Sequence, residues 1–216
     1  MKLINSFGPN PRMVRMFMAE KGIEIPMESV DLFTAENRQE PYRNKNPAGQ
    51  IPCLDLGEGR YLAETVAICE YLEELHPKPA LIGSNAWERG EARMMVRRVE
   101  LNATEYMYNA FRFGPGLPLF KDRTHCLPDA AAGLVAKGKE GLVLIDKLLA
   151  GKSFLCGERM TAGDIVLYCC LDFVGPTGQP VDPALKNVTA WMARMNDRPS
   201  AKSSLSANWK EVGMRG

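Results

Sequence analysis

The chain has 216 residues, of which 45% are hydrophobic, so it is long enough for one large domain or two smaller ones with a buried core. Lysine and arginine number 27 and aspartate and glutamate 26, which gives a formal net charge of +1. A chain so close to neutral has no net field that attracts nucleic acid or an anionic membrane, so neither is an expected partner.

The N-terminal sequence and the cysteine spacing further limit the class of protein. The opening MKLINSFGPNP reaches glycine and proline before an apolar core of signal-peptide length forms, and no apolar run is long enough for a membrane helix. We therefore expect a cytoplasmic protein. The six cysteines include no CxxC pair and mostly lie in apolar segments, so neither structural disulfides nor a bound metal is expected.

The beginning of the chain has the pattern of a β-α-β unit. Residues 2–5 form a short strand that ends at a turn rich in glycine and proline. Pro11 suits the first turn of a helix, because the N–H that proline lacks would be unpaired there, and Gly22 ends this helix. Residues 23–32 alternate well enough to predict a second strand. Residues 34–46 are polar and contain a proline, so they form at most a short irregular helix.

Residues 46–75 predict two strands and a helix in quick succession. The Ile51-Pro52 step enters an apolar strand, residues 57–59 supply a hairpin turn, and Glu64-Thr65 opens an amphipathic helix. Because the connections are short, the proline, the turn and the helix start are expected to lie close in space. The first 76 residues thus read β-α-β, irregular, β-β-α, and this stretch is half of a candidate small-molecule site.

The second half of the chain has helical patterns and effectively no strands. Prolines in residues 76–79 break the preceding helix, and a short connector follows. The helical patterns run over residues 86–113, from Pro128 to about residue 150, from Thr161 to residue 174, and over residues 183–197. The tail from Ser200 is small and polar, and we expect it to be mobile.

Two of these helices contain informative residues. Thr161 and Asp164 have the spacing of a capping box, in which the hydroxyl and the carboxylate satisfy free N–H groups at the helix start. The nearly unbroken apolar run that follows belongs in the centre of a helical bundle. Glycines in the helix after Pro128 are expected to weaken it by roughly 1 kcal/mol each relative to alanine; they are Gly133, Gly138 and Gly141.

Three motifs, NPAGQIPCL, LAETVAICEYL and MTAGDIVL, carry a resemblance to a known family. By their order, spacing and position after the β-α-β start, essentially the whole chain resembles a cytosolic glutathione S-transferase of the bacterial type. The resemblance implies an α/β thioredoxin-like domain of βαβ-ββα order at residues 1–77, a linker at 78–85 and an all-α domain at 86–216. It also implies glutathione as co-substrate, an electrophile pocket to which the helical domain contributes, and a homodimer.

The middle of glutathione is assigned to the strand entry. In the family this proline is cis, which is plausible for an X-Pro bond and would turn the N–H and C=O of Ile51 outward, toward the cysteinyl part of the tripeptide. The alternative is a trans Pro52 at the first residue of a strand. At the helix start, free N–H groups and the helix dipole favour the γ-glutamyl carboxylate, Thr65 adds a hydroxyl donor and Glu64 can take the ammonium group. The alternative there is a plain surface N-cap.

The glycyl end of glutathione needs hydrogen-bond donors. Resemblance points to Gln50, next to Ile51, and to Asn37 in the irregular segment. Both are neutral where relatives often place a cation, so this end is expected to be held less tightly. Either residue can instead be a solvated loop amide.

Thiol activation is expected between the first strand and the first helix. Because the thiolate is the nucleophile, the site must favour the anion with donors or a positive helix end. Several classes of the family use Tyr, Ser or Cys there, and residues 1–22 contain no Tyr or Cys. Resemblance places Asn10, in a Pro-Asn pair, where some bacterial relatives have a functional Asn, and Ser6 is the alternative donor. Asn10 can also be only a helix cap, and Arg12 and Arg15 either add positive potential or form a solvated face.

Aromatic residues are the candidates for the electrophile pocket. Tyr106, Tyr108, Phe111 and Phe113 crowd the end of one long helix and cannot all share one face, so some should point toward the substrate. The pocket set is Phe7, Tyr106, Phe111 and Phe113, although aromatics at this spacing are more often core. The two histidines, His76 and His125, lie in connectors and are expected to be solvated.

Two functions remain open at this point. The first is a transferase that delivers the glutathione thiolate to a small hydrophobic electrophile, as in detoxification, or uses it to reduce a peroxide or disulfide. The second is a binding or interaction module of the same fold that has lost the chemistry. The missing Tyr or Cys near the first helix motivates the second function.

Overall fold

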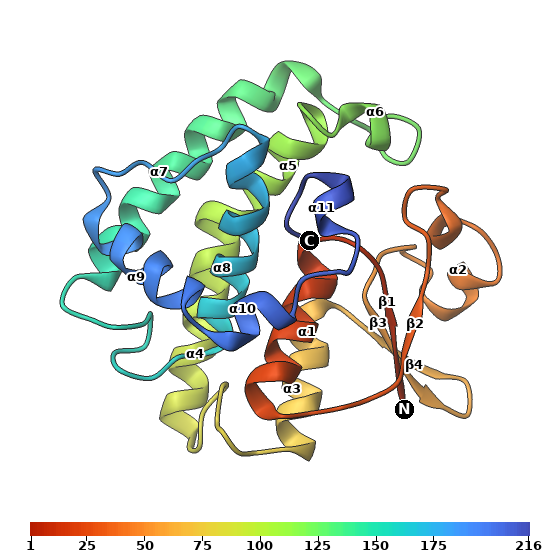
Figure 1. Ribbon diagram of the computed structural model, residues 1–216, viewed down its shortest axis with the longest axis horizontal. Helices are drawn as coiled ribbons and strands as arrows, with labels where there is room; N and C mark the ends of the chain where they lie inside the picture. Colours follow the sequence, from red (N-terminus) through yellow and green to blue (C-terminus); the bar gives the residue numbers. More distant parts are fainter. The chain divides into compact units, whose positions relative to one another are not determined.

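The computed structural model describes all of residues 1–216, which divide into two compact units (Figure 1). The first unit comprises residues 1–80 and 199–216, and the second comprises residues 81–198. The first contains a mixed β-sheet with helices and the second is helical. This is the fold class that the motifs predict.

The sheet of the first unit has four strands in the order β2-β1-β3-β4. Strand β1 pairs in parallel with β2 and antiparallel with β3, and β3 pairs antiparallel with β4. A crossover helix joins the parallel pair and a tight turn joins β3 to β4, as these two kinds of pairing require. The strands are β1 (Lys2–Asn5), β2 (Met27–Ser29), β3 (Cys53–Gly57) and β4 (Arg60–Ala63).

Helices α1 and α3 pack together beside the sheet (Figure 1). Helix α1 has Pro11 in its first turn, as predicted, and Gly22 ends it at φ 63°, a left-handed conformation that glycine adopts without strain. The helices of this unit are α1 (Pro9–Lys21), the 3₁₀ turn η1 (Glu36–Arg38), α2 (Tyr42–Lys45), α3 (Thr65–Leu75), α10 (Pro199–Ser203) and α11 (Trp209–Val212).

The second strand is much shorter than the alternation of residues 23–32 predicts. Only Met27–Ser29 is strand. Pro26 has no N–H for the ladder, although its carbonyl still accepts a hydrogen bond from the Leu3 N–H at 2.9 Å. After the strand, the Asp31 carboxylate accepts from the Phe33 N–H at 2.7 Å and turns the chain.

The tail is packed with the first unit, whereas the sequence predicts a mobile end of the helical domain. The side chain of Arg12 is fully buried and donates to the carbonyl of Ala201 at 2.9 Å. Arg15, also buried, donates to the carbonyl of Ser204 at 2.8 Å. The two arginines are therefore not a solvated face. Buried cations need acceptors, and residues 199–216 supply them.

The second unit is a bundle of helices around α8. The predicted long helix is α4 (Ala86–Val99), a π-helical turn η2 (Glu100–Thr104) and α5 (Glu105–Phe113), which follow one another without a break. The remaining elements are α6 (Leu117–Phe120), η3 (Pro128–Ala130), α7 (Ala131–Leu149), α8 (Ala162–Val174), η4 (Gly175–Thr177) and α9 (Lys186–Asn196).

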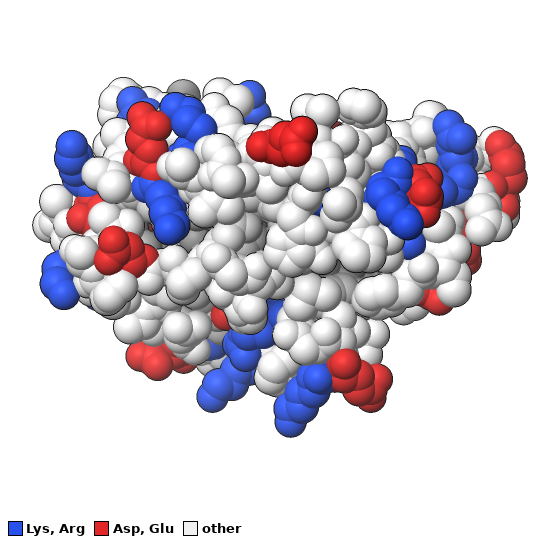
Figure 2. All heavy atoms as spheres, turned by 90° about the horizontal axis from the view of Figure 1, so that it is seen from above, with Lys and Arg blue, Asp and Glu red and all other residues white.

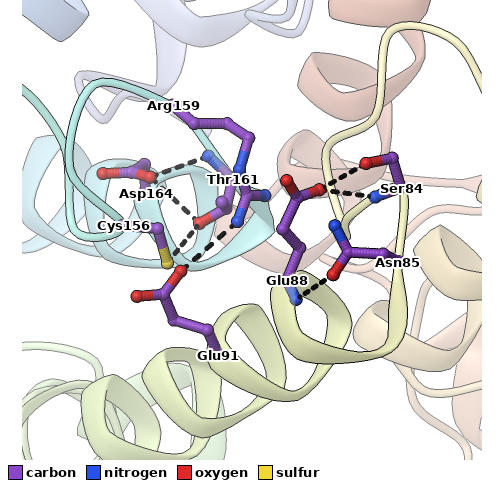
Figure 3. A network of polar contacts seen from close by, with 8 residues as sticks. All are labelled: Ser84, Asn85, Glu88, Glu91, Cys156, Arg159, Thr161 and Asp164. Atoms are coloured by element: carbon purple, nitrogen blue, oxygen red, sulfur yellow. Dashed lines mark hydrogen bonds and ion pairs between the residues drawn. The ribbon is translucent and has the colours of Figure 1, made fainter.

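Helix α8 is buried along nearly its whole length, as its apolar run predicts. Its start is held by the predicted capping box, in which the buried Asp164 carboxylate accepts from the Thr161 N–H at 2.8 Å (Figure 3). The same carboxylate accepts from the Leu155 N–H and from the indole N–H of Trp191, each at 2.9 Å. Burial raises the pKa of Asp164, and these hydrogen bonds oppose that rise.

The starts of helices α4 and α8 lie near each other in Figure 3. Asn85 caps α4 by accepting from the Glu88 N–H at 3.0 Å, and Glu88 accepts from Ser84. An Arg159–Glu91 ion pair at 3.4 Å joins the loop before α8 to α4. These contacts fix the ends of both helices.

Surface charge agrees with the near-neutral composition. On the face drawn in Figure 2, lysine and arginine side chains lie among aspartate and glutamate side chains. No helix is long and apolar enough to cross a bilayer. All six cysteines are free thiols.

Candidate functional site

The sheet register brings the three predicted binding segments to one edge. Ile4 of β1 lies opposite Cys53 of β3, which in turn lies opposite Ala63 of β4. The turn into α1 begins one residue after Ile4, at the end of β1, the Ile51-Pro52 step precedes Cys53, and Glu64 follows Ala63. Neighbouring strands are about 4.8 Å apart, so this row spans about 10 Å, roughly the length of an extended tripeptide.

The Ile51-Pro52 peptide bond is cis, as predicted. The N–H and C=O of Ile51 have no hydrogen-bond partner within the chain, so both can pair with a ligand. The preceding carbonyl, that of Gln50, accepts from the Tyr42 hydroxyl at 2.5 Å and from the Asn46 amide at 2.8 Å. These two side chains fix the loop, and the exposed Gln50 side chain stays available.

Cys53 follows the cis proline but does not offer a second nucleophile. Its side chain is fully buried, and burial raises the pKa of the thiol to about 11. The thiol is therefore protonated near neutral pH and is not the reactive form. Any thiolate chemistry at this edge needs a thiol supplied by a ligand.

The start of helix α3 has the features of an anion-binding site. Glu64 is the N-cap residue with φ 67, and its exposed side chain makes no capping hydrogen bond. Thr65 is the first helical residue, so the alternative of a Thr N-cap does not apply. The N–H groups of the first turn and the positive end of the helix dipole favour a carboxylate here.

The α1 helix start offers few backbone donors because it contains two prolines. Gly8 is the N-cap, and Pro9 and Pro11 have no N–H, which leaves the N–H groups of Gly8 and Asn10. The Asn10 side chain is half-buried and makes no capping bond, so the sequence alternative of a helix cap is not observed. Its amide remains free to donate to a ligand.

The side chains of Ser6 and Asn37, two further predicted ligand contacts, donate hydrogen bonds within the protein. The buried Ser6 hydroxyl donates to the Val30 carbonyl at 2.7 Å, so its proton is already engaged. Asn37 is 2% exposed and donates its amide to the Gly49 carbonyl at 2.6 Å. In this geometry Asn37 holds the loop that carries Gln50, and the solvated alternative does not apply.

The predicted pocket aromatics are divided between the two units. Phe7 belongs to the first unit, where its ring lies 5.8 Å from that of Phe33, a partner that the sequence reading missed. In the second unit, Phe111 is buried and meets the Phe173 ring edge-on at 4.9 Å, so it is part of that unit's core. Tyr106 and Phe113 are only partly buried.

Two features of the candidate site could not be predicted from the residue types alone. The left-handed φ of Glu64 is unusual for glutamate, and only the tight connection from β4 to α3 hints at it. The charged groups near the Gln50 loop were also missed: Arg38 donates to the Ala48 carbonyl at 3.2 Å, and Lys45 lies 3.4 Å from Glu28.

Comparisons with known proteins place the whole chain in one group. The family model "Glutathione S-transferase, N-terminal domain" matches residues 7–75, and "Glutathione S-transferase, C-terminal domain" matches residues 128–199. Glutathione S-transferase 2 of Saccharomyces cerevisiae is 29% identical over 94% of this chain and 88% of its own length. Maleylacetoacetate isomerase of Pseudomonas aeruginosa is 30% identical, over 71% of each chain.

A solved structure extends the comparison to three dimensions. The crystal structure of Gtt2 from Saccharomyces cerevisiae has a TM-score of 0.88 and 28% sequence identity to this chain. The match covers 95% of this chain and 100% of that one. The architecture of both units is therefore shared with a solved protein.

Proposed function

Because the chain belongs to the cytosolic glutathione S-transferase family, we propose that it binds glutathione, favours its thiolate and transfers it to a small hydrophobic electrophile. The observation that supports this proposal is the row from Ile4 through Cys53 to Ala63, which brings the three segments predicted to bind the ligand to one sheet edge. Use of the thiolate to reduce a peroxide or a disulfide is consistent with the same site.

Glutathione is bound along this row. The free N–H and C=O of Ile51, next to the cis Pro52, pair with the cysteinyl main chain. The first turn of α3, with Thr65, takes the γ-glutamyl carboxylate, and the Glu64 side chain takes the ammonium group. Gln50 donates to the glycyl carboxylate, and Asn37 acts through the loop that it holds.

Thiol activation falls to Asn10 in preference to Ser6. A glutathione thiol has an ordinary pKa of about 8.5, so donors must stabilise its anion at neutral pH. The Asn10 amide and its N–H stand at the positive end of α1 and are not used by the chain. The hydroxyl of Ser6 is bonded to Val30, so it must reorient before it can donate to sulfur.

The electrophile meets aromatic side chains. The candidates are Phe7 in the first unit and, within the second unit, Tyr106 and Phe113, while Phe111 is buried in the core of the second unit. The rings supply apolar area without a charged group, which suits a hydrophobic substrate. Conjugation rates measured with a series of electrophiles would identify the preferred substrate.

The proposal is tested by a calorimetric titration with glutathione and by conjugation to an aryl halide. Asn10→Ala removes one donor to an anion, worth about 1.5–3 kcal/mol, so the glutathione thiol pKa should rise by about one to two units. The conjugation rate near neutral pH should fall about 10- to 100-fold. Ser6→Ala should have a smaller effect, and Asn44→Ala, at an exposed position in α2, is the matched control.

A second candidate function is a glutathione-binding module without conjugating activity. This function is favoured by the hydrogen bond from the Ser6 hydroxyl to the Val30 carbonyl. Because of that bond, Asn10 is the only one of the two candidate side chains that is free to donate to the thiolate. Glutathione binding without conjugation, peroxide reduction or disulfide reduction above background would support this function. Absence of glutathione binding at millimolar concentration would contradict both functions.

We also propose that the protein is a cytoplasmic homodimer. Trp87, Met94 and Leu101 are 77%, 41% and 54% exposed and follow one another at seven-residue intervals along α4 and η2. Residues at this interval lie on one face of a helix, so the three side chains form an exposed apolar stripe. A second copy of the chain is the occupant that the family membership favours for this stripe.

A further inference from the structure

Helix α10 of the first unit is firmly attached to α1. Arg12 donates from Nη2 to the Ala201 carbonyl at 2.9 Å and from Nε to the Ser204 hydroxyl at 3.3 Å. Arg15 donates from Nε to the Ser204 carbonyl at 2.8 Å. Ala201 and Ser204 are buried, so α10 and the residue after it are a fixed root.

The chain beyond this root, residues 206–216, is a C-terminal strap with few buried groups. None of residues 205–215 is buried, and the only regular element in the strap is the four-residue α11. The strap closes on itself, because the N–H and the hydroxyl of Ser206 both donate to the Gly216 carbonyl at 2.8 Å. Arg12 Nη1 holds it through the Arg215 carbonyl at 3.2 Å. Segments with so little buried apolar surface open at a low free-energy cost.

The strap lies against the start of α1, where the C-terminal end of the chain is drawn beside that helix (Figure 1). A Cβ added at Gly216 would be 2.7 Å from the Gly8 nitrogen and 2.7 Å from the Phe7 ring. The main chain of Gly216 therefore lies close to the Gly8 nitrogen. This N–H is one of the two backbone donors that the proline-rich helix start offers.

We propose that the C-terminal strap is an autoinhibitory cover, which must move away from Gly8 before a glutathione thiolate can reach the start of α1. The inference rests on the proposed function. While Gly216 occupies the space in front of the Gly8 N–H, a sulfur atom cannot. The strap moves about Leu205 while its root stays bound to Arg12 and Arg15. Part of the binding free energy of glutathione is then used to displace the strap, which weakens the observed affinity.

Two substitutions loosen the strap and change no residue that is assigned a glutathione contact. Gly216→Ala places a Cβ against Gly8 and Phe7, and Gly133→Ala, where the added Cβ meets nothing within 4 Å, is its matched control. Ser206→Ala removes the hydroxyl bond to Gly216, and Ser203→Ala, at an exposed position in α10, is its control. Since one hydrogen bond contributes about 0.5–1.5 kcal/mol, Ser206→Ala should bind glutathione about two- to tenfold more tightly. Gly216→Ala should also bind glutathione more tightly, because the strap must shift to admit the added Cβ. The association rate constant should rise, and the controls should match the wild type.

Hydrogen exchange reports on the strap itself. On saturation of the wild type with glutathione, amides of residues 206–216 should lose protection while those of α10 keep it. Glutathione binding with unchanged or increased strap protection would overturn the inference and leave the proposed function standing. If both strap variants bound glutathione no more tightly than the wild type, the inference would likewise be overturned and the proposed function would stand. Failure of the wild type and of both variants to bind glutathione would overturn the inference together with the proposed function.

Discussion

The backbone of Glu64 lies at φ 67 and ψ 118, a conformation that costs a non-glycine residue about 1–3 kcal/mol. Strain of this kind persists where the surrounding structure enforces it, and here it occurs where β4 passes into α3. The same residue is assigned the ammonium group of glutathione. Backbone strain and the proposed ligand contact therefore coincide in one residue.

A substitution separates the two properties. Glu64→Gly should raise the free energy of unfolding by about 1 kcal/mol, because glycine adopts positive φ without strain. It should also weaken glutathione binding at least tenfold, since a charge-assisted contact worth about 1.5–3 kcal/mol is lost. Urea denaturation measures the first effect and calorimetry the second.

Glu58 provides the matched control for this change. It also has a positive φ, of 54, but is exposed in the β3–β4 turn, away from the assigned contacts. Glu58→Gly should also raise the free energy of unfolding, but it should leave glutathione affinity unchanged. Unchanged affinity in Glu64→Gly would remove Glu64 from the binding site.

At the scale of elements, two glycines of α7 act as contact points. The sequence predicts that glycine weakens this helix, but Gly138 and Gly141 are buried, and a Cβ at Gly141 would lie 1.8 Å from the Asn102 carbonyl oxygen of η2. A Cβ at Gly138 would lie 2.8 Å from the Met107 side chain. The absence of side chains lets α7 approach η2 and α5 closely.

This packing reverses the usual effect of replacing glycine in a helix. Gly141→Ala should lower the free energy of unfolding by about 2 kcal/mol or more, because backbone must move to admit the methyl group. Gly133→Ala, at an exposed position in the same helix, should raise it by up to about 1 kcal/mol. Urea denaturation of both variants tests the pair, and a stabilised Gly141→Ala would contradict the close approach of α7 and η2.

Elements with strong local signals were predicted from the sequence, and those that depend on distant partners were not. The capping box of Thr161 and Asp164 and the stop at Gly22 are encoded within a few residues, so α8 and α1 were identified. The shortness of β2 and the attachment of the tail through Arg12 depend on residues far away in the chain. In the candidate site, the motifs predicted the cis bond at Pro52 and the helix start at Glu64-Thr65, but residue type alone did not show that the side chains of Ser6 and Asn37 are hydrogen-bonded within the protein.

At the scale of the whole molecule, the exposed stripe of Trp87, Met94 and Leu101 is the feature that a monomer leaves unexplained. Single exposed apolar residues are common on protein surfaces, but three on one helical face, one of them a tryptophan at 77% exposure, are typical of an interface. Burial in a second copy would remove this apolar area from water and so stabilise a dimer.

Sedimentation equilibrium measures the outcome directly. The wild type should have twice the 24.0 kDa mass of one chain. Met94→Glu should shift the protein toward monomer, because a charge that enters an apolar interface loses its hydration without a partner. Leu144→Glu, at a 41% exposed position of α7 outside the stripe, should leave the mass unchanged. A wild type that sediments as a monomer at all concentrations, or a Met94→Glu variant that remains dimeric, would show that the stripe is not the interface between copies.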